Sequence, residues 1–123
     1  MTPEQLVQLW KGVGLVNALR YFTPPSWRML EWTETATALE TTAHLKSAYI
    51  LVGAFILSTV FAIPKVTTTT QAISVFKRTL PTMVLMNCVT FYVYPTVQNT
   101  AGKMNALGCL LFNLGALFYL SNP

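Results

Sequence analysis

An uncharged apolar run between Lys46 and Lys65 most constrains how this chain can fold. The 18 residues at positions 47–64 carry no charge and include nine Leu, Ile, Val or Phe side chains. On a membrane-insertion scale these side chains contribute about −3 to −5 kcal/mol in sum. Extended back to position 43, the run predicts a helix long enough to cross a hydrocarbon layer about 30 Å thick, and Pro64 is expected to end it.

Two further uncharged runs follow this one. The run at 79–102 comes after Lys77 and Arg78, with Pro81 expected in the first turn of its helix and Pro95 at the end. A third run begins at position 104 and continues to the last residue of the sequence. The polar segments between the runs are expected to be loops, the first of them at 65–78. The sequence therefore predicts an all-α integral membrane protein with three transmembrane helices at about 43–64, 79–96 and 103–121.

The composition favours this prediction over the alternative, a water-soluble helical bundle. Charged residues make up 10% of the chain and apolar residues 53%, whereas an ordinary soluble domain has roughly 25% charged residues. A small soluble protein has a high ratio of surface to volume and needs many charges to cover itself. The basic residues occur singly or as one pair and form no patch, which argues against nucleic acid as a partner.

Residues 1–40 differ from the three-span region at 41–123. All four acidic residues lie in this front segment. Thr2, Pro3 and Gln5 form the pattern of a helix N-cap and capping box. Apolar side chains then recur at helical spacing, which predicts an amphipathic helix lying on the bilayer surface or against a partner subunit, with an apolar face made of Leu6, Leu9, Trp10, Val13 and Val16.

All three tryptophans, Trp10, Trp27 and Trp32, occur in the front segment. One interpretation is that they are interfacial anchors, because amphipathic rings favour the headgroup layer. The other is that they dock a partner protein. Cations beside the predicted spans are candidates for binding anionic lipid headgroups, cardiolipin among them: Lys65, Lys77, Arg78 and Lys103.

Small and amide side chains recur at helical spacing along the predicted spans. Such residues let helices approach closely or form hydrogen bonds across helix contacts. They either hold the helices of this chain together or face a neighbouring subunit, and we expect at least one row to face a partner. The candidates are Ala54, Ser58, Ala62, Asn87, Asn105, Gly108, Cys109, Asn113 and Gly115.

Residue patterns for catalysis are missing from this sequence. His44 is the only histidine, no Cys/His cluster has the spacing of a metal site, and no span has an ionisable group near its middle. Cys88 and Cys109 are expected to be small buried side chains, although a pair between them stays open. We therefore expect no enzymatic activity, no catalytic or metal-binding residue, and no cofactor beyond bound phospholipid.

These features indicate a non-catalytic accessory subunit of a larger membrane complex. Small subunits of respiratory complexes and of ATP synthase are similar in kind, so the mitochondrial inner membrane is the expected location. Such a chain would act in assembly, helix packing and lipid binding, with other membrane subunits and anionic lipids as partners. Two alternatives stay open: a small subunit of a translocase, insertase or endoplasmic reticulum membrane complex, and a small homo-oligomeric channel or carrier.

Overall fold

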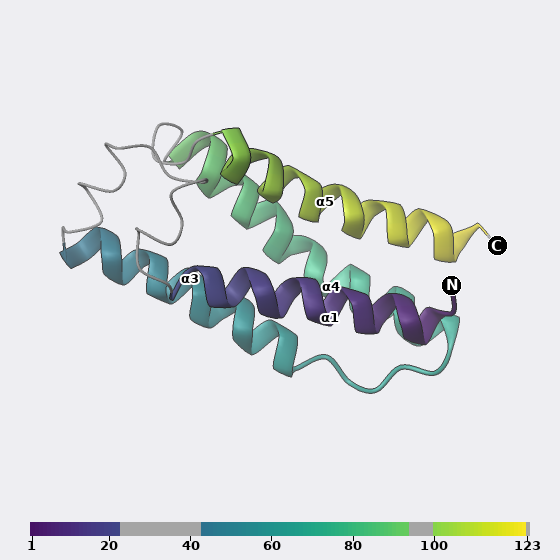
Figure 1. The fold of residues 1–123 in the computed structure, drawn as a ribbon. Coiled ribbons are helices and arrows are strands. Elements are labelled where there is room, and N and C mark those ends of the chain that lie inside the picture. The colour runs from purple at the N-terminus through teal and green to yellow at the C-terminus, as the bar shows by residue number, and fades with distance from the viewer. Residues whose placement is uncertain (23–42, 94–99, 123) are drawn as a thin grey trace.

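The computed structural model describes residues 1–22, 43–93 and 100–122, and within these ranges the chain is helical without strands (Figure 1). This confirms the prediction of an all-α protein. The helical elements are α1 (Pro3–Arg20), α3 (Ala43–Phe61), α4 (Thr69–Cys88), a π-helical turn η2 (Val89–Val93) that continues α4, and α5 (Thr100–Ser121).

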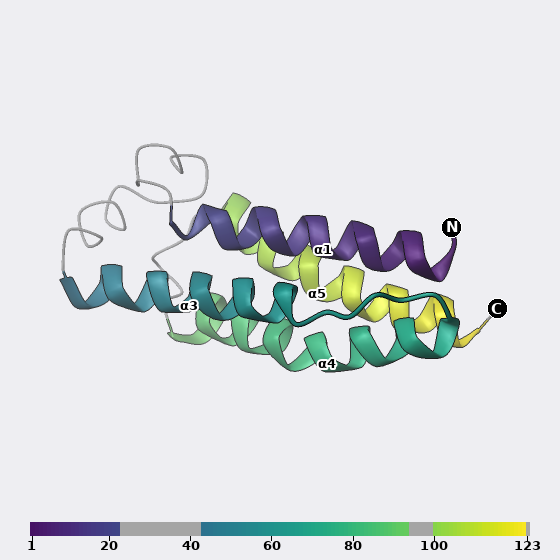
Figure 2. The same ribbon diagram turned by 90° about the horizontal axis from the view of Figure 1, so that it is seen from below.

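The four α-helices form an elongated bundle in which α1 and α4 run in one direction and α3 and α5 in the other (Figures 1 and 2). Specific contacts fix this arrangement. The side chain of Trp10 on α1 contacts that of Thr79 on α4, and Asn17 further along α1 contacts Asn105 near the start of α5. Helix α3 ends part way along the bundle, and an extended segment then follows the bundle to the start of α4.

Capping boxes define two helix starts. The backbone N–H of Gln5 donates to Oγ1 of Thr2, and the N–H of Thr2 donates to Oε1 of Gln5, as predicted. The same arrangement joins Thr68 and Gln71 and starts α4 at Thr69. The prediction of a loop throughout 65–78 is therefore wrong, because residues 69–78 are helical. Consequently Pro81 lies inside α4 rather than in its first turn.

Aromatic side chains from three helices form the centre of the bundle. The ring of Trp10 on α1 stacks on Phe112 of α5 at 5.2 Å between centroids and lies 5.7 Å from the ring of Phe76 on α4. Trp10 is 4% exposed, so the prediction that it anchors the chain in a headgroup layer is wrong. The reason is that this side of α1 packs against α4 and α5. Trp27 and Trp32, and Pro95, lie outside the described residues.

Helices α1 and α3 approach closely at two glycines. A Cβ atom on Gly14 would lie 2.6 Å from Cγ2 of Val60, and one on Gly53 would lie 2.7 Å from Cβ of Tyr21. Both distances are shorter than carbon atoms tolerate, because non-bonded carbons optimally lie about 3.5–4.0 Å apart. The two glycines therefore set the spacing of α1 and α3.

We expect Gly53→Ala to lower the free energy of unfolding by about 1–3 kcal/mol, the usual effect of overpacking. Gly108→Ala is the matched control, because a Cβ there meets nothing within 4 Å. That substitution should raise stability by up to about 1 kcal/mol through helix propensity. Unfolding followed by circular dichroism in detergent measures both changes. Equal shifts of the same sign would show that α1 and α3 do not pack at Gly53.

Within the described residues, one helix, Gly102–Ser121, is long and apolar enough to cross a membrane. Only 28% of its apolar window is buried, whereas the core helix of a soluble protein is mostly buried. The apolar part of α3 that the structure describes, Ile50–Phe61, is shorter than a membrane span. Three transmembrane helices are therefore not confirmed.

Candidate functional site: a polar interior and an apolar pocket

A threonine at the centre of the bundle joins three helices. Nε1 of Trp10 donates to Oγ1 of Thr79 over 3.2 Å, and Nδ2 of Asn113 donates to the same oxygen over 2.6 Å. The Thr79 hydroxyl in turn donates to the carbonyl oxygen of Phe76 over 3.3 Å. We refer to Trp10, Thr79 and Asn113 as the Thr79 junction. It connects α1, α4 and α5, and each of its side chains is buried.

Further amides link the helices on one side of the Thr79 junction. Nδ2 of Asn105 donates to Oδ1 of Asn17 over 2.8 Å, and Nδ2 of Asn17 donates to Sγ of Cys109 over 3.3 Å, which joins α1 to α5. Nδ2 of Asn87 donates to the carbonyl oxygen of Ala106 over 2.9 Å, which joins α4 to α5. These bonds fix the rotation and register of the helices relative to one another.

Two buried amide oxygens have no hydrogen-bond partner: Oδ1 of Asn87 and Oδ1 of Asn113. Most buried polar atoms in proteins are paired, because an unpaired buried acceptor costs about 1–3 kcal/mol. Each of these two amides is held through its NH₂ group instead. The interior is therefore not a fully satisfied network.

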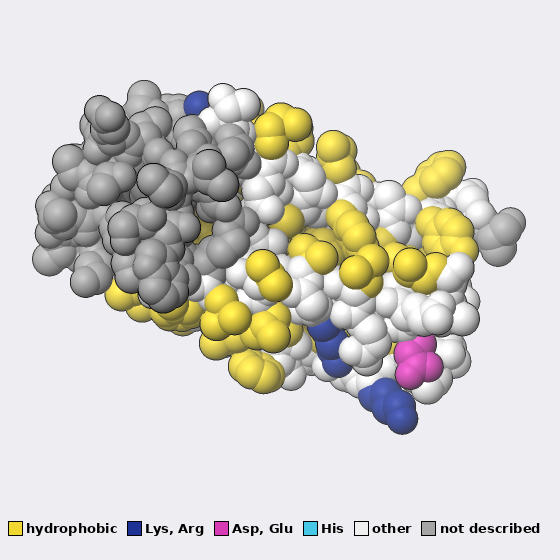
Figure 3. Space-filling view, in the orientation of Figure 1, with side chains coloured by type: hydrophobic (Ala, Val, Ile, Leu, Met, Phe, Trp, Pro, Cys, Tyr) yellow, Lys and Arg dark blue, Asp and Glu magenta, His cyan; other side chains and the backbone are white. Residues whose placement is uncertain are grey.

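Large apolar side chains are exposed on the surface, and a few polar side chains are buried within the mostly apolar interior. Buried polar side chains include Asn17, whereas its neighbour Val16 is 60% exposed and Leu9 is 45% exposed. The residues predicted to share one apolar face therefore divide, since Leu6 and Trp10 are buried against the bundle whereas Leu9 and Val16 are exposed. Helix α1 is rotated so that Trp10, Gly14 and Asn17 face the bundle. Figure 3 shows hydrophobic side chains gathered along one face of the bundle, with few charged side chains beside them.

The predicted packing residues divide into two groups. Asn87, Asn105, Cys109 and Asn113 make contacts within the chain, as described above. Five others are exposed: Ala54, Ser58 and Ala62 on or directly after α3, and Gly108 and Gly115 on α5. The residues that bring helices together closely, Gly14 and Gly53, were not among the candidates. A glycine inside an apolar helix was the available signal.

The four cations predicted to bind lipid headgroups occupy two regions. Lys65 lies in the extended segment after α3, and Lys77 and Arg78 lie on the middle of α4; all three are exposed. The contacts of α1 with Val60 and with Thr79 place the end of α3 at a similar level to this part of α4. Lys103 is half-buried near the start of α5. Binding of headgroups by these residues stays a prediction.

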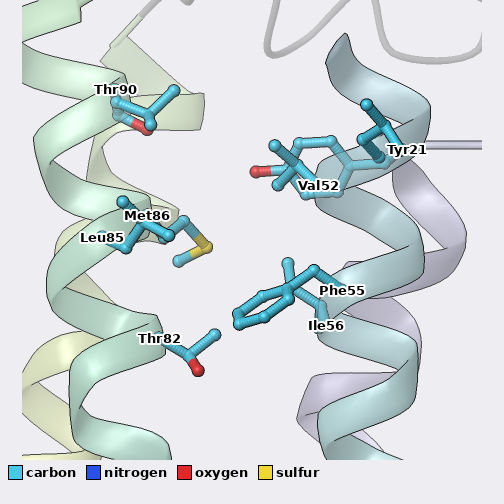
Figure 4. A pocket seen from close by; sticks show the side chains of 10 residues that line it. Tyr21, Val52, Phe55, Ile56, Thr82, Leu85, Met86 and Thr90 are labelled. Carbon is cyan, nitrogen blue, oxygen red and sulfur yellow. The ribbon is translucent and has the colours of Figure 1, made fainter. Parts of the chain in front are cut away.

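A pocket of about 200 Å³ lies between α3 and the second half of α4, and the sequence did not predict it. Its walls are Leu51, Val52, Phe55 and Ile56 on one side and the stretch from Thr82 to Thr90 on the other, with Tyr21 at one end. Figure 4 shows the Tyr21 phenol and the Phe55 ring extending from the α1–α3 side towards α4. The lining contains no charged residue.

Cys88 and Cys109 are not joined in a disulfide, and Cys109 is buried whereas Cys88 is exposed. The prediction of a buried side chain is confirmed for Cys109 and wrong for Cys88, which lies on the outer face of α4. The part of the chain that the structure describes contains no group of three or more His, Cys, Asp or Glu side chains able to hold a metal ion. The side chain of His44 lies outside that part.

No protein-family model, curated protein or solved structure matches this chain.

Proposed function

We propose that this protein is a non-catalytic, membrane-embedded accessory subunit of a hetero-oligomeric complex. The observation that carries the proposal is the apolar outer surface of the bundle, which encloses an apolar interior that also holds a few amide side chains. Asn17 and Asn113 are buried, whereas the large apolar side chains Leu51, Phe61 and Phe118 are at least 69% exposed. In water these apolar side chains would be more stable inside and the amides outside, because exposing apolar surface costs about 25 cal/mol per Å². Hydrocarbon imposes no such cost, and buried amides then hold helices together.

In this proposal α3, α4 with η2, and α5 cross the bilayer, and α1 packs among them instead of lying on the surface. Helix α5 has 22 residues and α3 has 19, which correspond to about 33 Å and 28 Å. The uncharged part of α4 and η2, from Thr79 to Val93, is shorter at about 22 Å. Lys65, Lys77, Arg78 and Lys103 are the proposed contacts for anionic headgroups, with cardiolipin as a candidate ligand.

The exposed small residues on and directly after α3 favour packing with a helix of another subunit. Ala54, Ser58 and Ala62 form an outward row at helical spacing, while the close approach inside the chain is made by Gly14 and Gly53. A small-xxx-small row permits close packing between membrane helices, and this row is exposed in the part of the chain that the structure describes. We infer that it faces another subunit. The proposed setting is an energy-converting complex of the mitochondrial inner membrane, a respiratory complex or ATP synthase.

Purification in mild detergent of the tagged full-length chain from its native membrane tests the proposal. We expect co-purifying membrane subunits, and loss of about tenfold of them with Ser58→Leu, equivalent to about 1.4 kcal/mol. Ser74→Leu is the matched control, an exposed serine on the polar half of α4, and should retain them.

Three results would contradict all or part of the proposal. Recovery of the chain alone, as a homo-oligomer that conducts ions, would favour a channel. A protein that stays folded and monodisperse in buffer without detergent would contradict the proposed membrane location. Co-purification with translocase or insertase subunits would keep the membrane role and overturn the mitochondrial setting.

A further inference from the structure

We propose that the pocket between α3 and α4 binds one acyl chain of a phospholipid. The inference rests on the proposed function, because the acyl chain would enter from the surrounding bilayer. Its starting point is the chemistry of the walls. Val52, Ile56 and Met86 form an apolar interior, and the more exposed Leu51, Phe55 and Leu85 surround the opening. The opening therefore continues into the apolar outer surface of the bundle.

The shape of the pocket fits a single hydrocarbon chain. Its wall on α4 and η2 runs from Thr82 to Thr90, which is about 12 Å along a helix axis. A volume of about 200 Å³ leaves room for part of one hydrocarbon chain and is too small for a whole lipid molecule. Whole drug-sized ligands need larger pockets, of about 300–1,000 Å³.

The polar groups of the pocket indicate which end of it the ester group of the acyl chain occupies. Tyr21 and Thr90 lie at one end, and the phenol oxygen of Tyr21 is turned towards α4 (Figure 4). At the other end, Thr82 lies opposite the Phe55 ring. A Tyr or Thr hydroxyl can donate to an ester carbonyl, so the ester end of the acyl chain lies by Tyr21 and Thr90. Helices α3 and α5 begin at this end of the bundle (Figure 1).

The backbone at the same end of the pocket is unusual. Val89 and Thr90 belong to the π-helical turn η2, which continues α4 directly. Single π-helical turns within α-helices occur frequently at functional sites. This observation is independent of the volume and polarity of the pocket, and it distinguishes this part of α4 from an ordinary outer helix face.

Photolabelling tests the proposal on the full-length chain in phosphatidylcholine vesicles. The probe is a phosphatidylcholine with a diazirine in one acyl chain. We expect label concentrated in residues 51–56 and 82–90. Val52→Trp fills the pocket and should reduce label in residues 82–90 about fivefold or more, because a filled cavity excludes the chain. Val84→Trp, on the exposed side of α4, is the matched control and should leave the label unchanged.

A second variant covers the case in which Val52→Trp does not fold. Leu85→Trp enlarges a side chain that is 54% exposed at the opening, so it should block entry without overfilling the core. Label spread evenly over exposed residues such as Leu111 and Phe118, and unchanged in either variant, would overturn the acyl site while the membrane role stands. Displacement of the label by geranylgeraniol but not by unlabelled phosphatidylcholine would overturn it in favour of an isoprenoid. A protein that does not sediment with the vesicles, and carries no label, would instead contradict the proposed function.

Discussion

Replacing Trp10 with alanine is expected to lower the free energy of unfolding by about 3–5 kcal/mol, the range for a large aromatic side chain removed from a core. Trp10 is 4% exposed and contacts the rings of Phe76 and Phe112, so its loss leaves a cavity where α1, α4 and α5 meet. It also removes one of the two donors to Thr79. Denaturant titration in detergent, followed by circular dichroism, measures the change.

Leu9→Ala is the matched control for Trp10→Ala. Leu9 is the adjacent residue on α1, but it is 45% exposed. Its truncation should change stability within about 0.5 kcal/mol, as for surface substitutions generally. Comparable losses from both substitutions would contradict the rotation of α1 described above, since that rotation places Trp10 inside and Leu9 outside.

Thr79→Val is expected to destabilise the bundle by about 3 kcal/mol, although the two side chains have nearly the same shape. The reason is that the hydroxyl accepts two hydrogen bonds, from Nε1 of Trp10 and Nδ2 of Asn113. Valine leaves both donors buried without an acceptor. The same unfolding titration measures this change, and tryptophan fluorescence reports the altered surroundings of the indole.

Thr59→Val controls for the loss of a hydroxyl as such. The Thr59 hydroxyl donates to the carbonyl oxygen of Phe55 on its own helix, over 3.0 Å, so no contact between helices depends on it. We expect a change below about 0.5 kcal/mol. If Thr59→Val and Thr79→Val destabilise the protein equally, the Thr79 junction does not connect the helices as the structure indicates.

The helices at 43–61 and 100–121 could be predicted from the sequence because uncharged apolar runs define them. The first half of α4 was not predicted, because Thr67 to Thr70 are β-branched residues that are typical of a connection. What starts the helix there is the capping box of Thr68 and Gln71, a signal present in the sequence. The same pattern at Thr2 and Gln5 did predict a helix start. The loop at 65–78 was predicted because the β-branched composition was given more weight than the capping box.

The predicted apolar face of α1 is divided in the structure for a different reason. Counting apolar residues at helical spacing puts Leu9 and Val16 on one face with Trp10, which holds for a helix between water and an apolar surface. In this bundle the small and polar side chains of Gly14 and Asn17 face inward, because α3 comes close and Asn105 supplies a hydrogen bond. A single helix does not reveal those neighbours. The pocket between α3 and α4 was missed likewise, since its walls lie far apart in the sequence.

The amide pair of Asn17 and Asn105 also determines when the bundle can close during biogenesis. Eighty-eight residues separate the two partners along the chain, and the ribosome makes about 5–20 residues per second. The earliest segment to emerge must therefore wait several seconds for its counterpart. A nascent chain arrested before α5 therefore lacks the Phe112 ring that covers the indole of Trp10 and the Asn105 amide that binds Asn17, and leaves both to whatever chaperone or insertion machinery holds it.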